Sequence, residues 1–229
     1  MSIEVSTGEE PYLIVSSDTH AGLQCENYRP YLESSLHDEF DKYVEERHEH
    51  RRITEEVNAD FLEKWEGENE EGLKGAYDSS VRNGVMDSDG ISGEIIFADG
   101  DAVTGQESPP FGAGLAAGQI TDPKLAFGGA RAHNRWLEEF CGDDPVRRAG
   151  IALVPITHDV DEAVKEIELL AEKPGIYGVM VPTMWHGFPP YGSDHYDKVW
   201  AACSETCLLY TSDAADEGLG VDLGGRRII

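Results

Sequence analysis

Basic residues are scarce in this chain, and it lacks both long apolar runs and paired cysteines. Its 229 residues include 45 acidic but only 18 basic side chains, so the formal net charge is −27. Such a chain repels phosphate backbones and anionic lipids, and we expect neither nucleic acid nor membrane surfaces as partners. No apolar stretch approaches the roughly 20 residues of a membrane-spanning helix. The four cysteines are scattered without a CxxC pair, which predicts free thiols and a cytoplasmic location.

Apolar, β-branched runs alternate with amphipathic helical patterns along the chain. We predict strands at residues 12–17, 91–98, 148–156 and 176–181, with helices at 123–140, after Asp159 and at 196–204. Near-continuous apolar strands separated by helices indicate a parallel sheet. The pattern fits an α/β fold, either a partial (β/α)₈ barrel or an open doubly wound sheet. No glycine-rich phosphate loop follows the first strand, which argues against dinucleotide binding.

A helical insertion is expected after the first strand, over about residues 30–81. Apolar side chains recur there at helical spacing, for example Leu36, Phe40 and Tyr43. The glycines between residues 67 and 75 break this pattern, so we expect a loop over that stretch.

The first strand ends with the acid-x-His motif Asp18-Thr19-His20. Side chains two residues apart in a strand point to the same face, so Asp18 and His20 would both project into a barrel mouth. Barrel enzymes keep their active sites at this carboxyl end of the strands. A carboxylate and an imidazole together favour a divalent-metal site, although further ligands must come from elsewhere. A helix cap or turn is the alternative interpretation of the tripeptide.

Several segments, in order, resemble the amidohydrolase-related family, which includes hydrolases and aromatic acid decarboxylases. The first is VSSDTHAG, and the others are AHNRWLEEF, a Pro-x-Arg strand entry, Gly-x-x-Gly-Val and YDKVWAACSET. The residues that carry the middle segments are Asn134, Trp136, Leu137, Pro145, Arg147, Gly175, Gly178 and Val179. The resemblance covers most of residues 11–206.

This resemblance implies a metal-binding (β/α)₈ barrel in which Asp18 and His20 are metal ligands. It implies a divalent ion, zinc first and manganese second, and a small-molecule carbonyl or carboxylate substrate. We expect hydrolysis of a C–N or C–O bond, with non-oxidative decarboxylation as the alternative. The family's remaining ligand and base, a histidine on strand five and an aspartate on strand eight, are not found in the sequence.

Other residues are weaker site candidates. Asp99, after the second strand, and Trp185 and His186, after the fourth, follow strands at the expected catalytic end and could contact substrate. His158 is interpreted as a loop or helix-entry residue, and His133 as an exposed or capping residue on its helix.

The end of the sequence resembles no protein family. Residues 207–217 (CLLYTSDAADE) and 221–229 (VDLGGRRII) match one reading frame of a sequencing-library adapter. We therefore expect residues 1–206 to be the front part of a barrel enzyme and residues 207–229 to be a non-native tail. An open half-barrel exposes strand edges and apolar faces, which predicts an inactive fragment whose copies associate as aggregates or homo-oligomers. A non-catalytic acidic binding module is the alternative from another class.

Overall fold

Five parallel strands form one sheet whose order follows the chain, β1-β2-β3-β4-β5. The computed structural model describes residues 12–98, 109–114, 120, 122–183 and 187–211. The strands are β1 Ile14–Ala21, β2 Ile91–Ala98, β3 Arg148–Leu153, β4 Ile176–Met180 and β5 Leu209–Thr211. Doubly wound sheets reverse their strand order at a switch point, whereas a barrel adds each strand beside the last. The fold is therefore the partial (β/α)₈ barrel that the sequence predicts.

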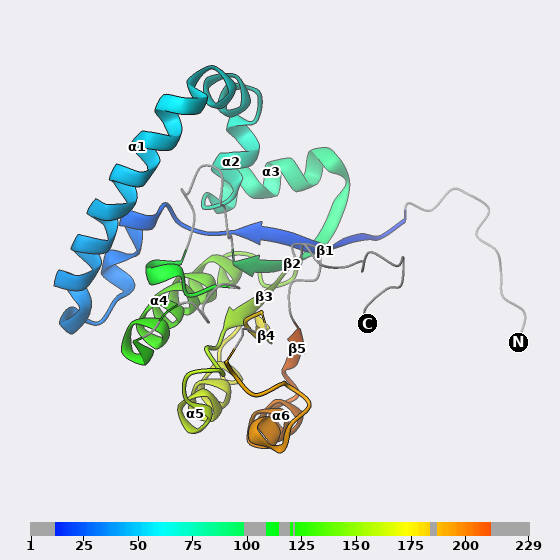
Figure 1. Ribbon diagram of the computed structural model, residues 1–229. Helices are drawn as coiled ribbons and strands as arrows, with labels where there is room; N and C mark the ends of the chain where they lie inside the picture. Colours follow the sequence, from blue (N-terminus) through cyan, green and yellow to red (C-terminus); the bar gives the residue numbers. More distant parts are fainter. Residues whose placement is uncertain (1–11, 99–108, 115–119, 121, 184–186, 212–229) are drawn as a thin grey trace, which may run out of the picture.

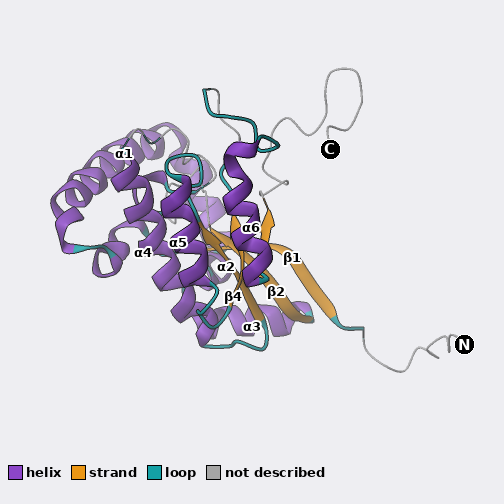
Figure 2. Ribbon diagram, turned by 90° about the horizontal axis from the view of Figure 1, so that it is seen from below, coloured by secondary structure: helices purple, strands orange, loops and turns teal. Residues whose placement is uncertain are grey.

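Helices lie along the outside of this sheet (Figures 1 and 2). They are α1 His37–Glu68, α2 Glu70–Gly75, α3 Ser79–Asp89, α4 Pro123–Gly142, α5 Val160–Leu170 and α6 Asp197–Thr206. Figure 1 shows α1, α2 and α3 near β1, while α5 and α6 lie at the other end beside β5. Within the described residues, no helix has the length and apolarity to cross a bilayer.

The two faces of the sheet belong to different apolar clusters, because strand side chains alternate. On β3, Ala152 is part of the larger cluster packed under the helices, and Ile151 and Leu153 belong to a smaller one on the opposite face. The larger cluster also contains Trp136 and Leu137 of α4.

Helix α5 begins where the sequence places its start. The Asp159 carboxylate accepts the Glu162 backbone N–H at 2.9 Å, which confirms the predicted helix cap. This cap fixes the first turn of the helix, and the apolar face of the helix then packs into the larger cluster through Ala163 and Ile167.

The helical insertion is confirmed, but the loop expected at residues 67–75 is wrong. Helix α1 continues through Gly67, and α2 includes Gly72. The break is the single residue Asn69, whose side-chain amide donates to the Trp65 carbonyl oxygen at 2.8 Å. A glycine in a helix costs only about 1 kcal/mol relative to alanine, so two exposed glycines do not end these helices.

Strand β1 runs later than predicted, from Ile14 to Ala21 rather than over residues 12–17. Asp18 and His20 lie within the strand, near its carboxyl end, as the sequence predicts.

The segment after α6 forms the short strand β5, which pairs with β4. The residue that ends α6, Cys207, has φ of 60°, a left-handed conformation that favours glycine. This is a local mismatch between sequence and fold at the first residue of the expected non-native tail. Residues 212–229 lie outside the described part of the chain, and the origin of the tail stays a prediction.

Candidate metal site

Asp18 and His20 lie together at the carboxyl end of β1. The Asp18 Oδ1 atom is 3.6 Å from His20 Nε2, and their side chains are 46% and 30% exposed. The predicted pairing of these two side chains is therefore present in the structure, on a strand end that solvent reaches.

A β-bulge shapes the strand at this point. Ser16 pairs with Glu94 and Thr19 with Ile96, so β1 advances three residues while β2 advances two. The extra residue interrupts the regular ladder between Ser16 and Thr19, a stretch that includes Asp18 of the motif. Bulges re-aim side chains and are common beside active sites.

The His20 ring is oriented by β2. Its Nδ1 atom lies 3.1 Å from the Ala98 carbonyl oxygen, and its ring centroid is 6.2 Å from that of Phe97. Because a carbonyl oxygen can only accept, this hydrogen bond places the hydrogen on Nδ1. When the ring is neutral, its lone pair is then on Nε2, the nitrogen nearer Asp18, and this is the tautomer that a metal-binding histidine in this orientation needs.

These two residues fit part of a divalent-metal site. Two atoms that are each about 2.1 Å from one ion can lie at most about 4.2 Å apart, so a 3.6 Å separation allows both to bind it. Among the described residues, no group of three or more His, Cys, Asp or Glu side chains could hold a metal. Asp18 and His20 would therefore supply two ligands of such a site.

The predicted substrate-contact residues cannot be placed against this pair. Asp99, Trp185 and His186 all lie outside the described residues. Their roles stay predictions.

His158 has the loop role that the sequence favours. Its Nε2 atom is 2.7 Å from the Ile120 carbonyl oxygen, and its ring centroid is 6.1 Å from that of Phe188. Ile120 precedes α4 and Phe188 follows β4, so His158 connects three segments that follow successive strands. Its ring has two polar neighbours, because Nδ1 also lies 3.2 Å from the Thr157 hydroxyl.

The prediction of an exposed or capping His133 is wrong. The side chain is fully buried on α4, and its Nδ1 atom is 2.9 Å from the Tyr28 hydroxyl. Burial lowers the pKa of His133 to about 3, so its imidazole is neutral. Sequence could not reveal the partner, because Tyr28 lies 105 residues away.

Sequence analysis also missed Glu94, a carboxylate on β2 that is only 3% exposed. The signal was available: an acidic residue inside the apolar run ISGEIIFA is buried only when it is paired. Its partners, Arg82 and Arg148, come from α3 and β3. Arg148 itself is fully buried.

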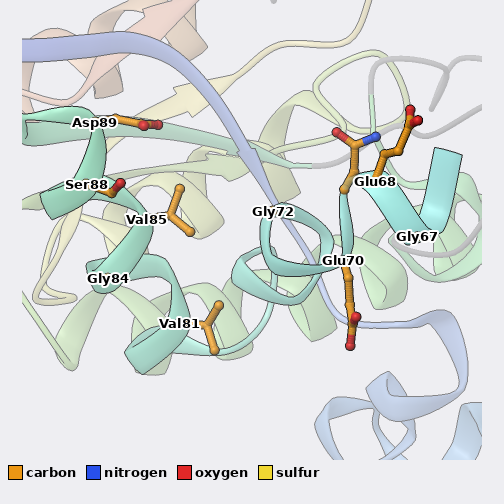
Figure 3. Close-up of a pocket in the computed structure, with 10 residues that line it drawn as sticks. Gly67, Glu68, Glu70, Gly72, Val81, Gly84, Val85, Ser88 and Asp89 are labelled. Atoms are coloured by element: carbon orange, nitrogen blue, oxygen red, sulfur yellow. The ribbon is translucent and has the colours of Figure 1, made fainter.

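Two cavities formed by described residues do not coincide with the metal-ligand pair. One of about 740 Å³ lies between the end of α1, α2 and α3. Figure 3 shows Val81 and Val85 on one of its sides and Glu70 on another. A second, of about 770 Å³, lies between Tyr31 and Arg135. Neither is lined by Asp18 or His20, whose strand end is open to solvent, so we assign the site from side-chain chemistry and not from cavity size.

The chain is similar to known proteins in both sequence and fold. The family model described as Amidohydrolase matches residues 99–210, a segment that begins after the Asp18–His20 pair. No curated protein matches the chain significantly.

Solved structures with a similar fold include two manganese-bound decarboxylases. A 5-carboxyvanillate decarboxylase from Novosphingobium aromaticivorans is 17% identical, with a TM-score of 0.55 over 90% of this chain and 53% of its own. A dihydroxybenzoic acid decarboxylase from Polaromonas is 15% identical, with a TM-score of 0.53 over 87% of this chain and 48% of its own. An amidohydrolase from Mycobacterium avium subsp. paratuberculosis is 22% identical, with a TM-score of 0.47 over 62% of this chain and 36% of its own. The chain thus spans about half the length of the two decarboxylases.

Proposed function

Because residues 99–210 of this chain belong to the amidohydrolase-related family, we propose that it is part of a metal-dependent enzyme that decarboxylates a small aromatic acid without oxidation. The observation that carries the proposal is the Asp18–His20 pair, with Nε2 of the histidine turned toward the carboxylate. Hydrolysis of a C–N or C–O bond is the second candidate, and the family description favours it.

Decarboxylation is preferred over the hydrolysis that sequence alone favoured. The two solved structures with TM-scores above 0.5 described above are both decarboxylases of aromatic acids. They share the arrangement of strands and helices with this chain, at identities that support a common fold and leave the reaction as a proposal.

In this proposal, the residues of the chain would bind a divalent ion and orient its ligands. When bound, a divalent ion supplies positive charge that holds substrate oxygens and stabilises charge developing on them. Asp18 contributes a negative oxygen ligand to such an ion, and His20 contributes a neutral nitrogen. The Ala98 carbonyl oxygen keeps the His20 ring from rotating and fixes which nitrogen is available.

Manganese is the first metal to test. Both decarboxylases above contain it, and an oxygen-plus-imidazole ligand set suits manganese as well as zinc. Zinc, the first expectation from sequence, stays the alternative.

Metal binding by the purified chain tests the assignment of the pair. Mn²⁺ is titrated into the protein, and free ion is followed by its electron paramagnetic resonance signal. We expect Asp18→Asn and His20→Gln each to weaken binding at least about tenfold, because each removes a ligand. His195→Gln is the matched control, since this exposed histidine lies on the turn before α6.

The outcomes distinguish a metal-dependent decarboxylase, a metal-dependent hydrolase and a non-catalytic acidic binding module. Equal Mn²⁺ binding by all four proteins would refute the site and favour an acidic binding module. If the pair binds the ion, the whole enzyme that contains this sequence is assayed with dihydroxybenzoates for CO₂ release, and with amide and ester analogues for hydrolysis. Hydrolysis without CO₂ release would refute decarboxylation. We expect no turnover from residues 1–229 alone, since the described part of the chain brings together only two ligands.

A further inference from the structure

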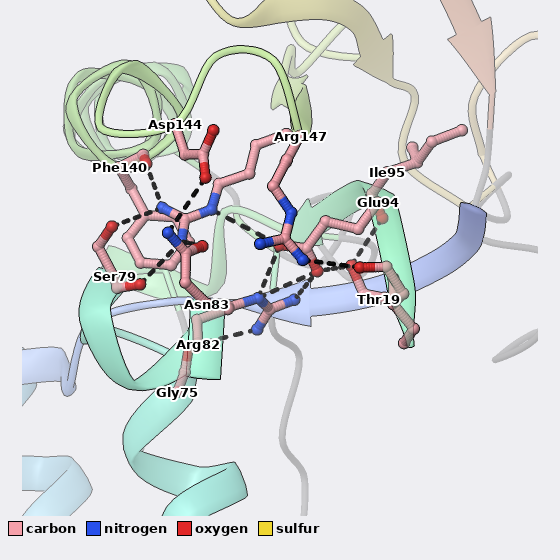
Figure 4. Close-up of polar contacts among 12 residues, drawn as sticks. Thr19, Gly75, Ser79, Arg82, Asn83, Glu94, Ile95, Phe140, Asp144 and Arg147 are labelled. Carbon is pink, nitrogen blue, oxygen red and sulfur yellow. Dashed lines mark hydrogen bonds and ion pairs between the residues drawn. The ribbon is translucent and has the colours of Figure 1, made fainter. Parts of the chain in front are cut away.

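A buried ion-pair network lies behind the metal-ligand strand, on the face of the sheet that the helices cover. The Glu94 carboxylate of β2 accepts hydrogen bonds from Arg82 of α3, at 2.9 and 3.0 Å from Nε and 2.7 Å from Nη2. The Arg82 and Glu94 side chains are only 12% and 2% exposed. Figure 4 shows this contact, with Thr19 on the other side of the carboxylate. Both partners of this buried pair have lost their contacts with water. Each charge therefore depends on the direct hydrogen bonds to the other, and these bonds fix the geometry of the pair.

The network is bonded directly to the two residues that follow the bulge in β1. The Thr19 hydroxyl donates to the Ile95 carbonyl oxygen at 2.8 Å and also lies 3.2 Å from Glu94 Oε2. The Arg82 Nη1 atom donates to the main-chain carbonyl oxygen of His20 at 2.9 Å. One arginine therefore joins α3, β2 and the backbone of a proposed metal ligand.

These contacts add to the support that the strand ladder gives directly after the bulge. The register shift lies between Ser16 and Thr19, and regular pairing of β1 with β2 resumes at Thr19 and His20. Thr19 faces the helix side and contacts Glu94, whereas His20 faces the opposite side and lies near Phe97. The Arg82–Glu94 network thus contacts β1 on the face that the helices cover. The His20 side chain, whose orientation the metal site depends on, lies on the opposite face.

We propose that Arg82 and Glu94 are positioning residues for the metal site, acting through Thr19 and the His20 main chain. The inference rests on the proposed function only in that Asp18 and His20 are taken as metal ligands. It also gives α3, the last helix between β1 and β2, a role in the site, because this helix supplies the arginine that contacts the ligand strand.

A purely structural role is the competing explanation, and Arg147 provides a control for it. The Arg147 guanidinium also joins α3 to β2, through Asp87 at 2.8 Å and the Ile91 carbonyl oxygen at 2.7 Å. Within the described part of the chain, neither of these guanidinium contacts involves β1. Arg147→Gln should therefore lower stability without changing the metal site.

The test uses substitutions chosen to leave the fold intact. Thr19→Val removes the hydroxyl at nearly constant volume, and Thr19→Ser keeps it. Arg82→Lys keeps the charge and loses the forked geometry. Each variant is measured for its unfolding midpoint, for Mn²⁺ affinity, and for the ring ¹⁵N chemical shifts of His20, assigned by comparison with His20→Gln.

We expect Thr19→Val and Arg82→Lys to weaken Mn²⁺ binding about 10-fold or more, because loss of residues that support the ligands weakens metal sites by such factors. The Mn²⁺ affinity of Thr19→Ser and Arg147→Gln should stay within about twofold of the wild-type value. Thr19→Val and Arg82→Lys should also lose the Nδ1-protonated signature of His20. Wild-type affinity and ring shifts in both variants would overturn the proposal, whatever their stability. If the wild type binds no Mn²⁺ the metal assignment fails, and the ring shifts alone then decide whether the network positions His20.

Discussion

The buried imidazole of His133 makes the fold sensitive to acid in a predictable way. The side chain is fully buried on α4, and among the described residues its Nε2 atom has no hydrogen-bond partner. Its folded-state pKa is lowered to about 3 from an ordinary value of 6.5, because burial penalises the charged form. Below pH 6.5 the His133 imidazole binds a proton in the unfolded chain but stays neutral in the folded chain, so the free energy of unfolding falls as pH falls.

The expected loss follows from these two values. Each unit of pKa difference corresponds to about 1.4 kcal/mol. Between about pH 7.5 and about pH 5.0, only the unfolded state titrates appreciably, and the contribution of His133 to the free energy of unfolding drops by about 2 kcal/mol. The loss continues to grow until the pH approaches about 3.

Urea unfolding at both pH values measures this effect. His133→Gln should lower stability at about pH 7.5 but remove about 2 kcal/mol of the difference between the two pH values. His195→Gln, at an exposed position, should keep the wild-type pH dependence. An unchanged pH dependence in His133→Gln would refute the reasoning, because the buried imidazole would then not be the group that titrates on unfolding.

Two further pairs of substitutions test the backbone geometry by their effect on the unfolding midpoint. A Cβ on Gly129 of α4 would overlap the Pro110 carbonyl oxygen, so Gly129→Ala should destabilise the fold by about 2–3 kcal/mol. Gly84 of α3 has open space around it, so Gly84→Ala should stabilise the fold by up to about 1 kcal/mol. Equal effects of the two would contradict the close contact. Cys207→Gly should stabilise by about 1 kcal/mol because it relieves the left-handed φ of 60°, while Cys207→Ala, which keeps the Cβ, should not; equal gains would point to the thiol instead.

The parts of the fold that sequence predicted are those set by local periodicity. Strands β2, β3 and β4 and helix α4 lie where alternating or helical apolar patterns placed them, and the Asp159 cap is a short-range signal. The sequential strand order could not be read locally, since two architectures share the same βα repeats. The pairing of each strand with its neighbour decides between them.

The features that sequence missed depend on partners far away along the chain. His133 is buried against Tyr28, and Glu94 is paired with Arg82 of another element. Helix α1 continues through Gly67 because an exposed helical glycine is only mildly unfavourable. For the candidate site, the motif predicted the pairing of Asp18 with His20. Nothing in it predicted the bulge between Ser16 and Thr19 or the carbonyl oxygen that orients the His20 ring.

The helical insertion also affects the order in which the sheet can assemble. About 70 residues lie between β1 and β2, against about 20 between β3 and β4, so closing the first connection costs about 1 kcal/mol more in chain entropy. We therefore expect β1 to join the sheet after β3 and β4 have paired, and pulsed hydrogen exchange during refolding would show its amides protected last. Protection of β1 before β3 would contradict this order. The strand that carries Asp18 and His20 would then be the last to join the sheet. These two ligands could therefore bind a divalent ion in their folded geometry only after the rest of the described sheet had formed.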